Sequence, residues 1–441
     1  MLRILHLSDI HFGQVKKSEL IFHDDVREQL AADLTRLLSG GKSLNLILIG
    51  GDISYSGKRK EYDRAVDWLD QLITVGHCDV NAVLTIPGNH DIDVSSIGKA
   101  AKLVYADLRN SNPDTAQNML DEYATESDDK NIIFPKLNTY LNFARGYNSD
   151  FDVKGIPQWT RCRDIKPGYR LRIIGMCSVQ VSDLYDEQGK MLLGKSQYLF
   201  PEDQSVVTLV MVHHPMAWFL DRDDAMRYIH ERTSILLTAH EHRFDLNKIT
   251  PMNGLERIEI SAGAITSTKS DGPFKFAYNL LELDVKEEHE GHKVLLSMTA
   301  WPRVWGVSAP HFGPDTVKTG GPDSKTITID CGLKPAPSEV LTMHTEVVSI
   351  QGKAMEHNEA ADFGRLKHFF WHYLTWDQRI IVLVHAKALP ESPENRLPQT
   401  IELESLLRAK ELGKLALVWD EVMSYVPQEK RKPNPFKQEA A

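Results

Sequence analysis

The sequence has few cysteines and no long apolar segment, and these two absences exclude several classes of protein. Four cysteines occur in 441 residues, and no two of them form a Cys-x-x-Cys pair: Cys78, Cys162, Cys177 and Cys331. This spacing argues against a disulfide framework and indicates reduced thiols. No apolar run approaches the ~20 residues that a membrane-spanning helix needs. The first apolar stretch leads directly into Asp9, which leaves no room for a cleaved signal peptide, so we expect a cytoplasmic protein.

The sequence also lacks an excess of positive charge. Its 51 Lys and Arg residues against 61 Asp and Glu residues give a net charge of -10 at pH 7. This balance argues against a surface that coats nucleic acid, although it is compatible with a local basic groove. An acidic protein repels a phosphate substrate at long range, and bound divalent cations would reverse that sign at the site.

Strands and helices alternate along most of the chain, which is long enough for two or three domains. Hydrophobic periodicity predicts helices at 24–38 and 59–75. Strands are expected at 2–7, 44–50, 82–86, 171–177, 206–212, 234–238, 256–262, 277–285, 293–300 and 325–330. This order predicts an α/β fold with right-handed crossovers and a largely parallel central sheet.

Two segments depart from this alternation within an expected catalytic domain at 1–335. Residues 93–170 are polar and partly helical, which favours an insertion or cap over the site. Residues 271–335 are expected to form a β-rich extension.

The C-terminal part of the chain changes character after Pro335 and Pro337, which predict a linker at 336–350. Residues 351–426 are predicted to form a small helical domain of four helices, with Thr375 and Gln378 as a capping box. We expect a disordered tail at 427–441, where three basic residues follow one another at 430–432.

Five short motifs rich in aspartate and histidine each follow a predicted strand. They are Asp9-Ile-His11, Gly51-Asp52, Gly88-Asn-His-Asp91, His213-His-Pro215 and His240-Glu-His242. Ligands in α/β folds collect at the carboxyl ends of strands, so we expect these side chains to share one crevice. Carboxylates, imidazoles and an amide bind borderline divalent metals. Any one motif is also compatible with a turn or loop of no function, but five in succession favour a centre for two metal ions.

In this order the motifs resemble those of the calcineurin-like metallophosphoesterases, over residues 1 to about 265. The resemblance implies a four-layer α/β/β/α sandwich and a metal-dependent phosphoesterase. Members of this family usually have glycine before the last His-x-His pair, where this chain has Ala239. We expect a slight backbone adjustment there and intact metal ligation.

The resemblance also implies roles for the motif residues. The metal ligands would be Asp9, His11 and His242 for one ion, Asn89, His213 and His240 for the other, and Asp52 as the bridge. His213 is preferred over His214 because the family places its ligand two residues before the proline. His90 resembles the histidine that contacts the phosphate and assists the leaving group, with Asp91 orienting its ring. Two manganese ions are expected, with iron, zinc or nickel as alternatives.

The fold does not determine the substrate. The His-His-Pro form and the strand-rich extension resemble a branch of cyclic nucleotide and glycerophosphodiester phosphodiesterases, so we expect a nucleotide or nucleic-acid phosphodiester. The C-terminal helices resemble effector-associated adaptors of bacterial defence systems. One alternative is therefore a DNA or RNA nuclease effector recruited through these helices. Another is a protein-binding role with an auxiliary metal site, and the helices are equally compatible with a lid or a self-association contact.

Histidines outside the motifs have simpler interpretations. His6 lies inside the first strand and is expected to be buried and hydrogen-bonded. His368 and His372 share a helix face at a spacing that could bind a metal, but no Glu-x-x-His pattern supports that role.

Overall fold

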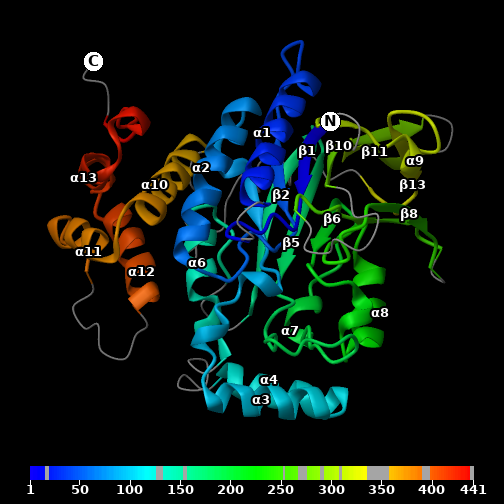
Figure 1. The fold of residues 1–441 in the computed structure, drawn as a ribbon, viewed down its shortest axis with the longest axis horizontal. Coiled ribbons are helices and arrows are strands. Elements are labelled where there is room, and N and C mark those ends of the chain that lie inside the picture. The colour runs from blue at the N-terminus through cyan, green and yellow to red at the C-terminus, as the bar shows by residue number, and fades with distance from the viewer. Residues whose placement is uncertain are drawn as a thin grey trace.

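The chain forms two β-sheets that lie face to face between layers of helices (Figure 1). The computed structural model describes residues 1–14, 19–125, 133–151, 156–251, 254–266, 276–288, 293–306, 310–334, 357–389 and 398–437. No described helix has the length and apolar character required to cross a membrane.

The first sheet has seven strands in the order β12-β11-β10-β1-β2-β3, with β13 beside β11. Its parallel part is β1 (Leu2–Leu7), β2 (Leu46–Ile49) and β3 (Val83–Thr85). Its antiparallel part is β10 (Ala277–Glu288), β11 (Lys293–Trp305), β12 (Phe312–Pro314) and β13 (Lys325–Ile329). β10 pairs with β1, placing Leu280 opposite Leu5. The β-rich segment at 271–335 therefore completes the central sheet.

The second sheet has six strands in the order β4-β5-β6-β7-β9-β8. They are β4 (Gln158–Lys166), β5 (Tyr169–Met176), β6 (Val206–Met211), β7 (Ile235–Thr238), β8 (Asp245–Ile249) and β9 (Arg257–Ser261). The middle strands run parallel, and the edge strands β4 and β8 run antiparallel. The expectation of one largely parallel sheet is wrong, because apolar periodicity reports neither strand direction nor the sheet to which a strand belongs.

Alternating residues of the second sheet face two different cores. Leu209 and Met211 of β6 belong to the large core between the sheets, whereas Val210 and Val212 face α8 (Arg222–Arg232). The short helix α7 (Lys195–Tyr198) packs beside α8 on this outer face.

The outer face of the first sheet is covered by α1 (Glu19–Leu37) and α2 (Arg59–Val75), whose apolar residues join the large core. The short helix α9 (Thr316–Thr319) lies between β12 and β13 in the chain. The four layers are α1 and α2, the first sheet, the second sheet, and α7 with α8. They confirm the expected four-layer α/β/β/α sandwich (Figure 1).

The segment at 93–170 is only partly an insertion. It begins with α3 (Lys99–Asn110), α4 (Pro113–Thr125) and α6 (Asn138–Arg145). It then includes β4 and the first residues of β5, which belong to the second sheet. The predicted boundary at residue 170 is wrong because β4 is an edge strand. Its exposed positions carry polar residues such as Thr160 and Asp164, which resemble a loop in the sequence.

The C-terminal helices form a module with a core of its own. They are α10 (His357–Tyr373), α11 (Trp376–His385), α12 (Pro398–Glu411) and α13 (Leu415–Tyr425). The capping box of Thr375 and Gln378 at the start of α11 is confirmed. The predicted linker at 336–350 lies outside the described residues.

Residues 427–437 are packed, so the prediction of disorder is wrong for this part of the tail. Phe436 lies against Trp419 with ring centroids 5.8 Å apart. Lys430 Nζ donates to Asp67 at 2.8 Å and to Asp70 at 3.2 Å, both on α2. The partners of Lys430 lie more than 350 positions away in the sequence, so no local pattern indicates that this lysine is bound.

Helix α10 holds the module against the sandwich (Figure 1). His372 Nε2 lies 2.9 Å from the carbonyl oxygen of Phe143 in α6. Arg365 pairs with Asp79 at 2.7 Å, next to the 3₁₀ helix Val80–Ala82. Lys367, which is buried, lies 3.6 Å from Asp150. The module therefore shares a polar, partly buried interface with the sandwich.

Truncation of the chain after Lys334 should destabilise the sandwich, because Asp150 would lose the charge of Lys367. Asp150 keeps Arg161 at 3.9 Å, so the cost should be smaller than the ~3–5 kcal/mol of a buried charge left without any partner, and we expect the melting temperature to fall by about 2–5 °C. The measurement is thermal unfolding followed by circular dichroism, with a chain truncated after Lys437 as the control. An unchanged melting temperature in the chain truncated after Lys334 would contradict a stabilising interface.

Candidate metal centre

The motif residues meet at the carboxyl ends of strands in both sheets, where their backbones are hydrogen-bonded to one another. Asp9 N donates to Gly51 O at 3.0 Å, which joins the loops after β1 and β2. His213, after β6, places Nδ1 2.7 Å from Gly50 O and so links the two sheets. Ala239 N, after β7, donates to His213 O at 2.9 Å. Four of the five motif loops are thus connected by hydrogen bonds, two of them between main-chain atoms and one through the His213 side chain.

The backbone of this region adopts a conformation that side chains rarely tolerate. Of the eight described non-glycine residues with positive φ, five belong to the motifs, with φ between 51° and 68°. They are Asp9, His11, Asp52, His240 and His242. Such conformations cost free energy and persist where the surroundings enforce them, which is frequent at functional sites.

Close approach of the loops requires glycine at two positions. A Cβ on Gly51, where φ is +102°, would lie 2.6 Å from His213 Nδ1, and one on Gly88 would lie 2.1 Å from Asp52 Oδ1. Glycine is not required at position 239. Ala239 does not have a positive φ, and its methyl group lies beside Gly50, which has no side chain. Alanine therefore fits where related sequences usually have glycine.

Asp52 lies at the centre of the cluster. Its Oδ2 is 3.2 Å from His11 Nε2 and 3.5 Å from His213 Nε2. Asp9 Oδ1 lies 3.1 Å from His242 Nε2. The groups close enough to share an ion include Asp9 with His11 and His242, and Asp9 with Asp52 and His213. Asp52 is therefore between two sets of ligand atoms.

Several buried atoms of the cluster lack hydrogen-bond partners among the residues that the structure describes. They are Asp9 Oδ2, Asn89 Oδ1 and His213 Nε2. A buried polar atom without a partner is costly and rare in native proteins. Divalent cations would satisfy these atoms, and the set of carboxylate, imidazole and amide donors suits borderline metals. The residues present thus fit two divalent ions.

The charges of the cluster are strongly interdependent. Burial alone would raise the pKa of Asp52, but His213 and His11 outweigh it and hold this pKa well below its usual range. Burial opposes protonation of His213, yet Asp52 and Asp9 raise its pKa to about 9. Burial and the charge of His213 lower the pKa of His240 to about 4. The cluster therefore retains its carboxylates ionised and favours cations.

His90 lies at the edge of the cluster, and its expected partner Asp91 points elsewhere. His90 Nδ1 lies 3.0 Å from Tyr55 O. The Asp91 carboxylate instead accepts hydrogen bonds from the main-chain nitrogens of Ser54 (2.9 Å) and Gly88 (3.0 Å). The expectation that Asp91 orients the His90 ring is therefore wrong. Asp91 holds the loops of Asp52 and His90 together, because the turn of 3₁₀ helix at Asn89–Asp91 directs its side chain inward.

Sequence reasoning missed the aromatic residues behind this loop. Tyr62 Oη donates to Asp91 Oδ1 at 2.9 Å, and its ring lies 4.9 Å from that of Phe143. Phe143 O in turn faces His372 of the module. The only available signal was that Tyr62 occupies the buried face of the predicted helix at 59–75. Its contact with Asp91 depends on the tertiary fold.

The second imidazole of the His-His-Pro motif also reaches the cluster. His214 Nδ1 lies 2.8 Å from Ser178 Oγ, and a nitrogen of its ring can share an ion with His213 and His240. The ring of Trp218 lies 4.4 Å from that of His240, edge to face. Sequence reasoning left His214 aside and gave no signal for Trp218.

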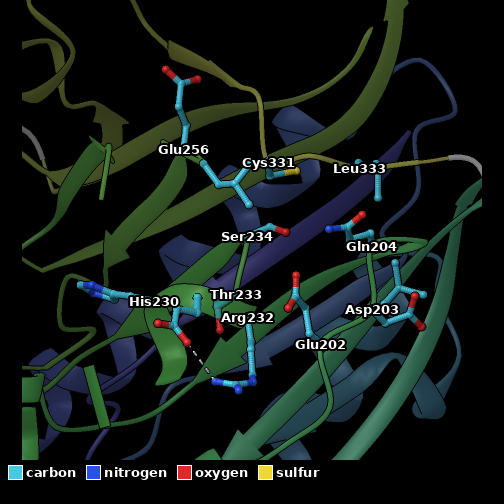
Figure 2. A pocket seen from close by; sticks show the side chains of 13 residues that line it. Glu202, Asp203, Gln204, His230, Arg232, Thr233, Ser234, Glu256, Cys331 and Leu333 are labelled. Atoms are coloured by element: carbon cyan, nitrogen blue, oxygen red, sulfur yellow. Dashed lines mark hydrogen bonds and ion pairs between the residues drawn. The ribbon is translucent and has the colours of Figure 1, made fainter. Parts of the chain in front are cut away.

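Three other histidines and one pocket lie away from the cluster. His6 is buried near Asn279, as expected. His368 and His372 place their Nδ1 atoms 3.0 Å apart, at hydrogen-bond distance from each other, while their Nε2 atoms face Asp70 and Phe143 O. Figure 2 shows a pocket lined by residues such as Asp203 and Ser234, at the amino ends of β6 and β7. It is at the opposite end of these strands from the cluster.

A model of the calcineurin-like phosphoesterases matches residues 2–244, which is more than half of the chain. The chain belongs to the calcineurin-like phosphoesterase family. Metal-dependent cleavage of phosphoesters is the chemistry of this family. A model of the GTPase-associated adaptor domain matches residues 362–424, within the helical module. No match is found among curated proteins.

The solved structures that match the chain weakly include two phosphatases. A purple acid phosphatase from yellow lupin is 12% identical, with a TM-score of 0.36 over 76% of this chain and 57% of that one. A phosphatase from Mycoplasma pneumoniae is 10% identical, with a TM-score of 0.30 over 78% and 97%. This phosphoesterase thus spans little more than half the length of the lupin enzyme.

Protons and divalent metals should compete for this cluster. In protein stripped of metal, the raised pKa of about 9 leaves His213 protonated at neutral pH, whereas ligation requires a free lone pair on Nε2. The apparent affinity for Mn²⁺ should therefore rise from pH 6 to 9, by up to about tenfold per unit, and level off above pH 9. Titration calorimetry in buffers of different ionisation enthalpy measures both affinity and proton release. An affinity that is constant between pH 6 and 9 would contradict this electrostatic description.

Proposed function

We propose that the chain hydrolyses phosphodiester bonds of nucleotides or nucleic acid with the help of two divalent metal ions, of which manganese is the best candidate. The observation that carries the proposal is the convergence of five motifs on buried ligand atoms around Asp52. Two such ions, when bound, would lower the pKa of water and offset the negative charge of the phosphate.

We assign the metal ligands as two sets that share Asp52. Asp9, His11 and His242 would hold one ion, and Asn89, His213 and His240 the other. The central position of Asp52 supports its bridging role. Main-chain contacts of His213 Nδ1 with Gly50 O leave Nε2 for ligation. The same geometry makes His214 an alternative ligand to His213 for the second ion, since both belong to one candidate group.

We assign His90 the task of protonating the leaving oxygen. With Nδ1 directed to Tyr55 O, its Nε2 is the nitrogen left for the substrate. The ring lies against His11, with centroids 4.8 Å apart, which keeps it next to the metal ligands. Asp91 contributes indirectly, because it ties the His90 loop to the Asp52 loop.

We place the catalytic domain at 1–335 and the helical module at 351–426, and we propose a protein-binding role for the module. The match to an adaptor domain supports this second function. The exposed apolar residues of the helical module include Trp376 and Val384 of α11, which face away from the module's core. A nuclease effector recruited through this module is the most specific form of the proposal.

Chelation should abolish hydrolysis of bis-p-nitrophenyl phosphate, and Mn²⁺ should restore it. Asp52→Asn should lose the second ion and nearly all turnover, because the amide carries no negative charge and offers one ligand oxygen where the carboxylate offers two. Elemental analysis counts the ions, and Glu241→Gln, which lies in the last motif but is not a proposed ligand, is the matched control. Two equivalents of metal retained by Asp52→Asn would show that the bridging assignment is wrong.

His90→Ala should keep both ions but slow cleavage of diesters with poor leaving groups by about 10²–10⁴-fold, the usual contribution of a general acid. The loss should be much smaller for p-nitrophenyl esters, because p-nitrophenolate departs without a proton. Steady-state rates on alkyl and p-nitrophenyl diesters measure the difference. Equal losses on both substrates would contradict the acid role.

A further inference from the structure

Tyr55 lies three residues after Asp52, and both its main chain and its ring contact His90. The two ring centroids are 5.0 Å apart with an interplanar angle of 18°, a stacked arrangement. The Tyr55 carbonyl oxygen is 3.0 Å from His90 Nδ1. The side chain is 37% exposed. Tyr55 therefore covers one face of the His90 ring at the edge of the cluster.

The turn that carries Tyr55 is itself held firmly. Tyr55 N donates to Phe12 O at 3.0 Å, which attaches the turn to the loop after β1. Gly57 N donates to Ser54 Oγ at 3.1 Å. Gly57 has φ +68°, and a Cβ there would lie 2.5 Å from the carbonyl carbon of Ile92. The Tyr55 carbonyl is thus fixed relative to both neighbouring motif loops.

These contacts determine the tautomer and orientation of His90. A carbonyl oxygen only accepts hydrogen bonds, so Nδ1 must carry a proton, and Nε2 becomes the nitrogen that faces the substrate. The His11 ring meets His90 edge to face, with centroids 4.8 Å apart and an angle of 85°. The imidazole is therefore confined by Tyr55 and His11 together.

We propose that Tyr55 is the positioning residue for His90, with its carbonyl selecting the tautomer and its ring preventing rotation of the imidazole. This inference rests on the proposed role of His90 in protonating the leaving group. Removal of the Tyr55 ring leaves the carbonyl in place but exposes one face of His90, so the ring spends less time in the productive orientation. The effect should be confined to steps that need the proton.

The test compares Tyr55→Ala, Tyr55→Phe and the control Tyr185→Ala in the full chain loaded with Mn²⁺. Tyr185 is 70% exposed and belongs to none of the motifs. For an alkyl diester, Tyr55→Ala should lower kcat about 2- to 10-fold, the range expected from loss of one aromatic stack. For a p-nitrophenyl diester, kcat should stay within about twofold of the wild type. Tyr55→Phe and Tyr185→Ala should match the wild type on both substrates, because phenylalanine retains the stack.

Several outcomes would overturn the inference. An equal loss of kcat on both substrates would indicate general damage to the site. A rise in KM without a change in kcat would mean that the ring contacts the substrate and not His90. Failure of Tyr55→Phe to restore the rate would assign the effect to the hydroxyl group.

A second measurement separates this inference from the proposed function. His90 must act as the imidazolium, which gives its Nε2 proton to the leaving oxygen and keeps the Nδ1 proton on Tyr55 O. Nitrogen NMR at one fixed pH should therefore show, for the neutral form of the His90 ring, only the Nδ1–H tautomer in the wild type and in Tyr55→Phe, and a mixture of tautomers in Tyr55→Ala. A wild type that cleaves no diester, with this pattern intact, would refute the proposed function alone. An active wild type whose His90 signal is identical in Tyr55→Ala would refute the positioning role alone.

Discussion

The buried carboxylate of Asp52 is the constraint on which the rest of the structure depends. It lies among imidazoles that hold its pKa low, and one of its oxygens accepts the main-chain N–H of His90 at 2.8 Å. A charge in such a position is stable only when cations or imidazolium groups balance it. The positive φ values of five motif residues and the glycines at 51 and 88 follow from the need to bring ligand atoms to this one carboxylate.

A second buried carboxylate organises the loops around the first. Asp91 receives main-chain N–H groups from both motif loops and the hydroxyl of Tyr62. Tyr62 rests on Phe143 of α6, and the helical module contacts the same residue through His372. The module is therefore attached to the helices that support the centre, while its α11 surface stays exposed. This arrangement combines an adaptor-like domain and a catalytic fold in one packed unit.

The convergence of the motifs could be predicted from the sequence because it follows a general rule: each motif ends a strand, and the ends of parallel strands meet. The bounds of α2 and the capping box of α11 were equally accessible, since both depend on local patterns. Contacts between distant parts of the chain were not. β10 joins β1 across more than 270 residues, and Lys430 meets α2 across 360. Nothing local in either segment identifies its partner.

The same difference between local patterns and tertiary contacts applies to the roles of individual residues. The resemblance implies that Asp91 orients His90, whereas the turn directs the carboxylate toward Ser54 and Gly88. Tyr55 takes its place through a main-chain carbonyl, a group that no residue identity encodes. Residue type thus predicted which side chains lie together in the cluster, while the supporting contacts depend on backbone geometry.

Anomalous diffraction from crystals of the full chain grown with Mn²⁺ tests the central claim most directly. The account predicts two anomalous peaks on opposite sides of the Asp52 carboxylate, one beside His11 and His242 and the other beside His213 and His240. A single peak, or two peaks that do not share Asp52, would contradict it.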